Sequence, residues 1–204
     1  MGVSLATIGN HDIDFSSGFL KDISISIKNK LDNMVIKNSD SFIKWSQLKW
    51  EAFNCKITDE RMEKILKRKD WDYEIHNDDD WQEIDFYGPL YLELSFNKTY
   101  IKIWDPPDRY ENWFLYNGDS YRNEWRKYFK TIVNTFSGDR VIYLPDNLVS
   151  SSIYLDFEGT YKELERNLKK EYGFTKKNIN DIKEKDFSNG NYLYYYVDEL
   201  EDID

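Results

Sequence analysis

The segment that most constrains the fold runs from Tyr110 to Asn147. Within it, apolar and aromatic side chains recur every three or four residues, which predicts an amphipathic helix over 120–136. Asp119 or Ser120 can cap its first turn, and Gly138 is expected to end it in a left-handed conformation. The run of apolar residues at 141–144 then predicts a short strand, and Pro145 is expected to end it. A helix so rich in aromatic residues needs a wide surface to cover, most simply a sheet that includes this strand.

Shorter patterns predict the remaining elements. Alternating or apolar runs indicate strands at 3–8, 13–15, 90–96, 99–104, 153–157 and 192–197. Helical spacing indicates helices at 19–31, 58–66 and 160–172, with Ser17 as the cap of the first and a capping box of Thr160 and Glu163 on the last. We interpret 70–85 as an acidic surface loop or sheet edge. The order predicts one α+β domain over 1–197, with a mostly antiparallel sheet packed against amphipathic helices, and a fraying acidic tail at 198–204.

Charge limits the classes of partner. The chain has 28 Lys and Arg against 38 Asp and Glu, a formal net charge of −10. Such a surface repels nucleic acid and anionic membranes and attracts a basic protein. The one cysteine, Cys55, cannot form an internal disulfide, and we expect it to be a small, semi-buried residue. We find no signal-peptide pattern and no apolar run of membrane-spanning length, so the cytoplasm is the expected location. No cofactor is expected.

The stretch Gly9-Asn10-His11-Asp12 resembles the Gly-Asn-His-Asp signature of calcineurin-like metallophosphoesterases, where Asn and His bind a two-metal site. The resemblance implies a metal-dependent hydrolase that uses His11, Asp12 and, from the acidic loop, His76. The chain departs from that family because too few residues precede Gly9 to hold its earlier Asp-x-His and Gly-Asp motifs. The competing interpretation is a hairpin turn.

The acidic loop around His76 has its own alternative interpretations. Carboxylates close in sequence can bind a hard cation, but the run Asp78-Asp79-Asp80 lacks the alternate spacing and the glycine of an EF-hand loop. A solvated acidic loop is therefore the favoured interpretation. A thiol dyad of Cys55 with either histidine is also conceivable, although no local feature activates this cysteine.

Two stretches, 70–85 and 105–114, combine the residue types that dominate protein interfaces, namely aromatic, arginine and charged side chains. The predicted partner-binding residues are Asp78, Asp79, Asp80, Trp81, Arg109, Tyr110, Trp113 and Phe114. The alternative for the second stretch is a core position with a stacked arginine. Two nearby stretches, 123–126 and 138–140, pair arginine with acids, which indicates buried or stacked ion pairs that fix the long helix to the sheet.

Over its whole length the chain resembles an uncharacterised bacterial protein family, a resemblance that implies no activity. It rests on Ser4-Leu5-x-x-Ile8-Gly9-x-His11, Tyr87-Gly88-Pro89, Asn123-Glu124-Trp125-Arg126 and the stretch from Gly138 to Asp146. Small acidic bacterial proteins without catalytic motifs are often immunity proteins or antitoxins. The leading hypothesis is therefore a non-catalytic, protein-binding module that neutralises a basic toxin, and the metal-dependent phosphoesterase is the alternative.

Overall fold

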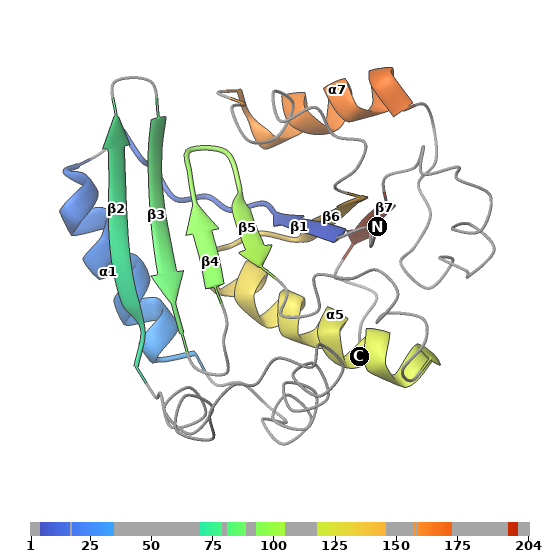
Figure 1. Cartoon of the computed structure of the whole chain (residues 1–204), viewed down its shortest axis with the longest axis horizontal. Coiled ribbons are helices and arrows are strands. Elements are labelled where there is room, and N and C mark those ends of the chain that lie inside the picture. Colours follow the sequence, from blue (N-terminus) through green and yellow to red (C-terminus); the bar gives the residue numbers. More distant parts are fainter. Residues whose placement is uncertain are drawn as a thin grey trace, which may run out of the picture.

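Seven strands form one antiparallel sheet in the computed structural model of this chain, in the order β2-β3-β4-β5-β1-β6-β7 (Figure 1). The strands are β1 Leu5–Gly9, β2 Asp72–Asp78, β3 Trp81–Tyr87, β4 Glu93–Phe96, β5 Ile101–Trp104, β6 Arg140–Pro145 and β7 Tyr196–Glu199. The structure describes residues 5–16, 18–34, 70–78, 81–88, 93–104, 118–145, 157, 159–172 and 196–199.

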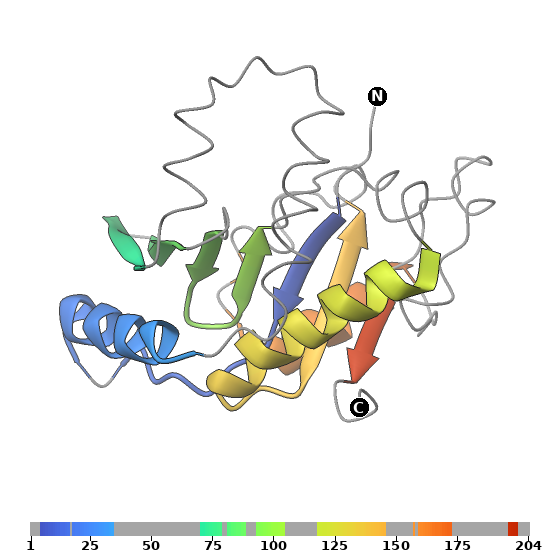
Figure 2. The same ribbon diagram turned by 90° about the horizontal axis from the view of Figure 1, so that it is seen from below.

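Helices cover both faces of this sheet. The helices α1 (Leu20–Asp32) and α5 (Gly118–Thr135) pack on one face, and α7 (Tyr161–Tyr172) packs on the other (Figure 2). The predicted α+β fold with a mostly antiparallel sheet is therefore confirmed. None of the described helices is both long and apolar enough to cross a membrane.

The predicted helix and strand of the 120–144 segment form the centre of the fold. Phe129, Ile132 and Val133 of α5 are fully buried against the sheet. Along β6 the side chains alternate between the two cores, because Val141 and Tyr143 pack on the α1/α5 side while Ile142 packs with α7. This alternation is the period of two that a strand imposes on its side chains.

The end of α5 differs from the prediction in one residue. The left-handed residue is Ser137, with φ of 60°, and not Gly138, whose φ lies outside the left-handed range. Gly138 is needed for a different reason: a Cβ there would lie 2.1 Å from the backbone oxygen of Asn10 and 2.6 Å from a methyl carbon of Val133. Its N–H donates to the carbonyl of Val133, which closes the helix.

Other local predictions were wrong in whole or in part. Residues 13–15 form no strand. Of the two interpretations of 70–85, the surface loop was wrong and the sheet edge was right. The stretch forms the β2–β3 hairpin, with a seven-residue register from Asp72↔Tyr87 to Asp78↔Trp81, and β2 is the edge strand of the sheet. The residue before α1 is Phe19, which has no side-chain hydrogen bond that caps the helix, and Ser17 lies outside the described residues. The predicted strands at 90–96 and 99–104 leave two residues between them, whereas β4 ends at Phe96 and β5 begins at Ile101, so the turn is Asn97–Tyr100.

The supposed acidic tail begins inside the last strand. Asp198 and Glu199 belong to β7, and the Asp198 side chain is 1% exposed. Its carboxylate accepts hydrogen bonds from Nε and Nη2 of Arg126 at 2.6 and 2.7 Å. The prediction that arginine in this stretch of the helix forms a buried ion pair with the sheet is thus confirmed, with a partner 72 residues away.

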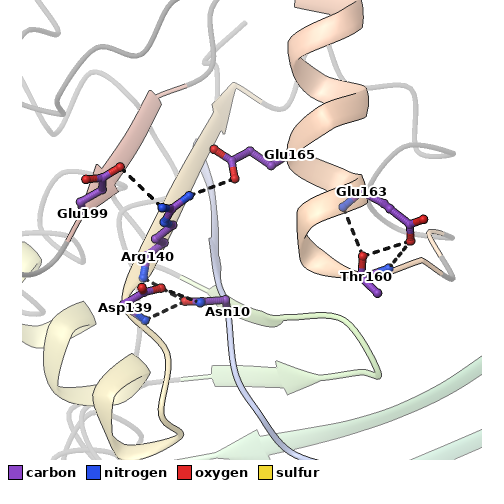
Figure 3. A network of polar contacts seen from close by, with 7 residues as sticks. All are labelled: Asn10, Asp139, Arg140, Thr160, Glu163, Glu165 and Glu199. Atoms are coloured by element: carbon purple, nitrogen blue, oxygen red, sulfur yellow. Dashed lines mark hydrogen bonds and ion pairs between the residues drawn. The ribbon is translucent and has the colours of Figure 1, made fainter.

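The capping box of α7 is also confirmed. The Thr160 N–H donates to the Glu163 carboxylate, and the Glu163 N–H donates back to the Thr160 hydroxyl (Figure 3). The predicted helix at 58–66 and all of the predicted strand at 153–157 except Phe157 lie outside the described residues.

Candidate functional site

The Gly9–Asp12 turn begins at the end of β1. It bonds to the connection between α5 and β6 through Asn10 and to the β4–β5 turn through His11. The Asn10 side-chain oxygen accepts the N–H groups of Asp139 and Arg140, both at 2.9 Å, and its Nδ2 donates to the Asp139 carboxylate at 2.8 Å (Figure 3). Arg140 in turn pairs with Glu165 of α7 at 3.2 Å. The Asn10 side chain therefore fixes the turn between α5 and β6.

His11 is held at both ring nitrogens. Nε2 lies 2.9 Å from the carbonyl oxygen of Asn97, and Nδ1 lies 3.0 Å from the N–H of Ile13. A carbonyl only accepts and a backbone N–H only donates, so Nε2 carries the proton and the ring is neutral. Burial lowers the pKa of His11, against smaller opposing effects of the Asn97 carbonyl and Asp12, which agrees with a neutral ring.

This geometry does not favour the metal-dependent alternative. His11 contacts Phe15 and Phe96 on the α1/α5 side of the sheet. His76 lies on the opposite side, because its neighbour Ile75 packs toward α1 and successive strand residues alternate. One ion cannot bind both rings. Among the described residues no group of three or more His, Cys, Asp or Glu is placed to hold a metal ion.

A polar surface lies on the opposite side of β2–β5, which we name the acidic sheet face. Cross-strand partners share a face, so the register places the following side chains together: Asp72, Glu74, His76, Asp78, Glu83, Asp85, Tyr87, Glu93, Ser95 and Lys102. Six of these are carboxylates and one is a lysine. One row crosses all four strands, from Glu74 through Asp85 and Ser95 to Lys102.

Exposure changes along this row. Glu74 on β2 is exposed, the Asp85 side chain is 16% exposed, and Lys102 on β5 is 6% exposed. Asp85 Oδ2 lies 2.9 Å from Nε2 of His76, while its buried Oδ1 accepts no hydrogen bond from the described residues. The face therefore offers water-exposed acids at one edge and a more desolvated carboxylate behind them.

The acids set the electrostatic potential of the face. Burial lowers the pKa of Lys102 to about 8, although Glu83, Asp85 and Glu93 oppose the shift by favouring its charged form. The pKa of Tyr87 is raised, first by burial and then by Asp85, Glu93 and Glu74. These carboxylates thus disfavour a further negative charge and favour a positive one on the same surface.

Only part of the predicted partner site can be located. Asp78 ends β2 on the acidic sheet face, and Trp81 begins β3 at the position paired with it. The other predicted contact residues, Asp79, Asp80, Arg109, Tyr110, Trp113 and Phe114, lie outside the described residues, as does Cys55.

Sequence reasoning missed Glu74, Asp85 and Lys102 as members of one surface. The alternation of Tyr73 and Ile75 with polar residues was the signal that could have found them. Asp12, the third residue of the metal alternative, is exposed and lies beside α1 on the other side of the sheet.

The comparisons with known proteins add no family or function. No family model, no curated protein and no solved structure matches this chain. What the protein does is therefore inferred from its own residues.

Proposed function

We propose that this chain is a non-catalytic protein-binding module whose acidic sheet face binds a protein with a basic surface. The single observation that carries the proposal is the collection of six carboxylates with one lysine on neighbouring strands. The net charge of −10 acts in the same direction over longer distances. A bacterial immunity or antitoxin protein that neutralises a cationic toxin fits these properties, and the cytoplasm is its expected location.

The gradient of exposure suits two stages of such binding. Exposed acids on β2, such as Glu74, attract a basic partner before contact and raise the association rate. Asp85 lies deeper and keeps one buried oxygen that accepts no hydrogen bond from the described residues. A partner's arginine can reach only the exposed part of the Asp85 side chain, 16% of it, because Oδ1 is buried. We expect an arginine of the partner to contact Asp85 there, since charge-assisted hydrogen bonds are strong.

The proposal is tested with the product of the gene that neighbours the gene of this chain. The two proteins are produced together and apart in bacteria, and growth shows whether this chain relieves toxicity. Their association and dissociation rates are then measured by surface plasmon resonance at low and high salt. A small molecule turned over by this chain, with no protein partner bound, would contradict the proposal.

A matched pair of variants tests the face itself. Glu74→Gln on the acidic sheet face should slow association about two- to fivefold at low salt, and the difference should shrink at high salt. Glu171→Gln removes the same charge from an exposed position on α7 and should leave the rate unchanged. Equal effects of the two variants would mean that net charge, and not this face, attracts the partner.

A further inference from the structure

A groove of about 410 Å³ lies on the other side of the sheet, between the loop that follows β1 and helix α1. Its polar lining includes Asp12, Asp14 and Asp22, and its apolar lining includes Ile13, Ile23, Ile27 and Phe136. The volume falls in the range of small-molecule sites, which combine an apolar lining with a few converging polar groups. The groove is separate from the acidic sheet face, because Ile27 and Phe136 belong to the α1/α5 core.

The groove already accommodates a cation of the chain itself. Lys30 lines it, and the Lys30 ammonium lies 5.4 Å from the centroid of the Phe136 ring, within the range of a cation–π interaction. Phe136 is 0% exposed, so a ligand reaches its ring only by displacing Lys30. A second cation in the groove would therefore compete with Lys30 for this ring.

The carboxylates give the groove a net negative charge despite Lys30. Hydrogen bonds from the Ser16 hydroxyl and N–H lower the pKa of Asp14, so this group is ionised at neutral pH. Asp12 and Asp22 are exposed acids on the loop and on the first turn of α1. Three acidic residues and one lysine line the groove, so the charge complement of the groove is a cation.

We propose that this groove binds a small organic cation, an ammonium or guanidinium group carried on an apolar stem. The charged end lies among Asp12, Asp14 and Asp22, and the stem lies against Ile13, which is partly exposed, and Ile23. Lys30 weakens this binding, because it holds the aromatic ring and repels the incoming charge. The inference does not depend on the proposed function, because it uses another face of the protein and another class of ligand.

The test compares two probes of equal length, n-hexylammonium and neutral n-hexanol, titrated into the full chain and followed by amide NMR spectra. Hexylammonium should shift the signals of residues 12–16 and of α1, and hexanol should bind more weakly. Equal binding of both probes would overturn the proposal, since the groove would then be a simple apolar hollow. Shifts confined to β2 and β3, or no shift at all, would overturn it as well.

Variants of the groove sharpen the test. Asp12→Asn should raise the dissociation constant for hexylammonium about two- to fivefold, and Glu171→Gln on α7 should not. Lys30→Met should lower the dissociation constant by about two- to fivefold, because the ring is released. Lys28→Met is its control, since Lys28 pairs with Asp32 on the same helix and does not line the groove.

Two results of this comparison would contradict the proposal. If Lys30→Met and Lys28→Met change the affinity equally, the effect is one of total charge and not of the groove. If Asp12→Asn and Glu171→Gln weaken binding equally, hexylammonium binds to acidic surface in general. Lys30→Gln replaces Lys30→Met if the latter does not fold, and the same increase in affinity is expected.

Discussion

Two polar regions of this protein use similar residue types in opposite ways. In the Gly9–Asp12 turn, the Asn10 side chain and both ring nitrogens of His11 bond to the chain itself. On the acidic sheet face, carboxylates outnumber cations, and those on the edge strand β2 point away from the α1/α5 core. The turn carries the sequence that resembles a catalytic motif, yet its polar atoms stabilise the fold. The acidic sheet face, which resembles no catalytic motif, is the region that we propose binds a partner.

The largest expected effect concerns Asp198, whose carboxylate forms a buried ion pair with Arg126. Asp198→Ala leaves Arg126, 6% exposed, without its bidentate partner. Removing one member of a buried ion pair costs about 3–5 kcal/mol, and chemical denaturation should show a loss of that size. Glu199→Gln, at a 52% exposed carboxylate 3.8 Å from Arg140, should cost less than about 1 kcal/mol. Equal losses would mean that burial does not distinguish these two acids.

Lys102 should destabilise the protein at neutral pH. Its pKa falls from 10.5 to about 8 on folding, so between these values the unfolded state binds more protons and stability rises with pH. Below about pH 8 the full cost is present, on the order of 3 kcal/mol. Lys102→Met should therefore raise the free energy of unfolding at pH 7 by that amount and remove its rise above pH 8.

The exposed Lys98 of the β4–β5 turn provides the control. Lys98→Met should leave both the stability at pH 7 and its rise above pH 8 unchanged. Lys102→Met also makes the acidic sheet face more negative, so it should speed association with a basic partner. A destabilised Lys102→Met variant would show that the lysine is a net stabilising partner of the surrounding acids.

Gly138→Ala should destabilise the turn between α5 and β6, to which the Asn10 side chain is hydrogen-bonded. The added Cβ would meet the Asn10 backbone oxygen at 2.1 Å, and relieving such a contact costs about 1–3 kcal/mol or more. Gly18→Ala is the matched change, because nothing lies within 4 Å of a Cβ at that position. Thermal unfolding of the two variants would contradict the account if Gly18→Ala were the more harmful change.

The sequence could predict what depends on neighbouring residues. The helix at 120–136, the strand at 141–144 and the Thr160–Glu163 capping box follow from local spacing and local hydrogen bonds. The two strands of the β2–β3 hairpin were missed because aspartate is depleted in strands, so an acid-rich stretch was interpreted as a surface loop or sheet edge. Its period of two was nevertheless present in Tyr73 and Ile75.

What could not be predicted depends on partners far along the chain. Asn10 bonds to Asp139, 129 residues away, and Asp198 bonds to Arg126. Neither pair leaves a local pattern, so an acidic C-terminal stretch could not be told from a fraying tail. The candidate site could not be predicted for the same reason, because only the register of four strands brings Glu74, Asp85 and Lys102 into one row.

The most direct measurement of the contrast between the two regions compares Asn10→Ala with Glu74→Gln in two assays, chemical denaturation and the rate of association with the basic partner. Asn10→Ala should lower the free energy of unfolding by about 1–3 kcal/mol and leave the association rate of the folded protein unchanged. Glu74→Gln should leave stability unchanged and slow association about two- to fivefold at low salt. Slower association for Asn10→Ala with no effect of Glu74→Gln would contradict the account.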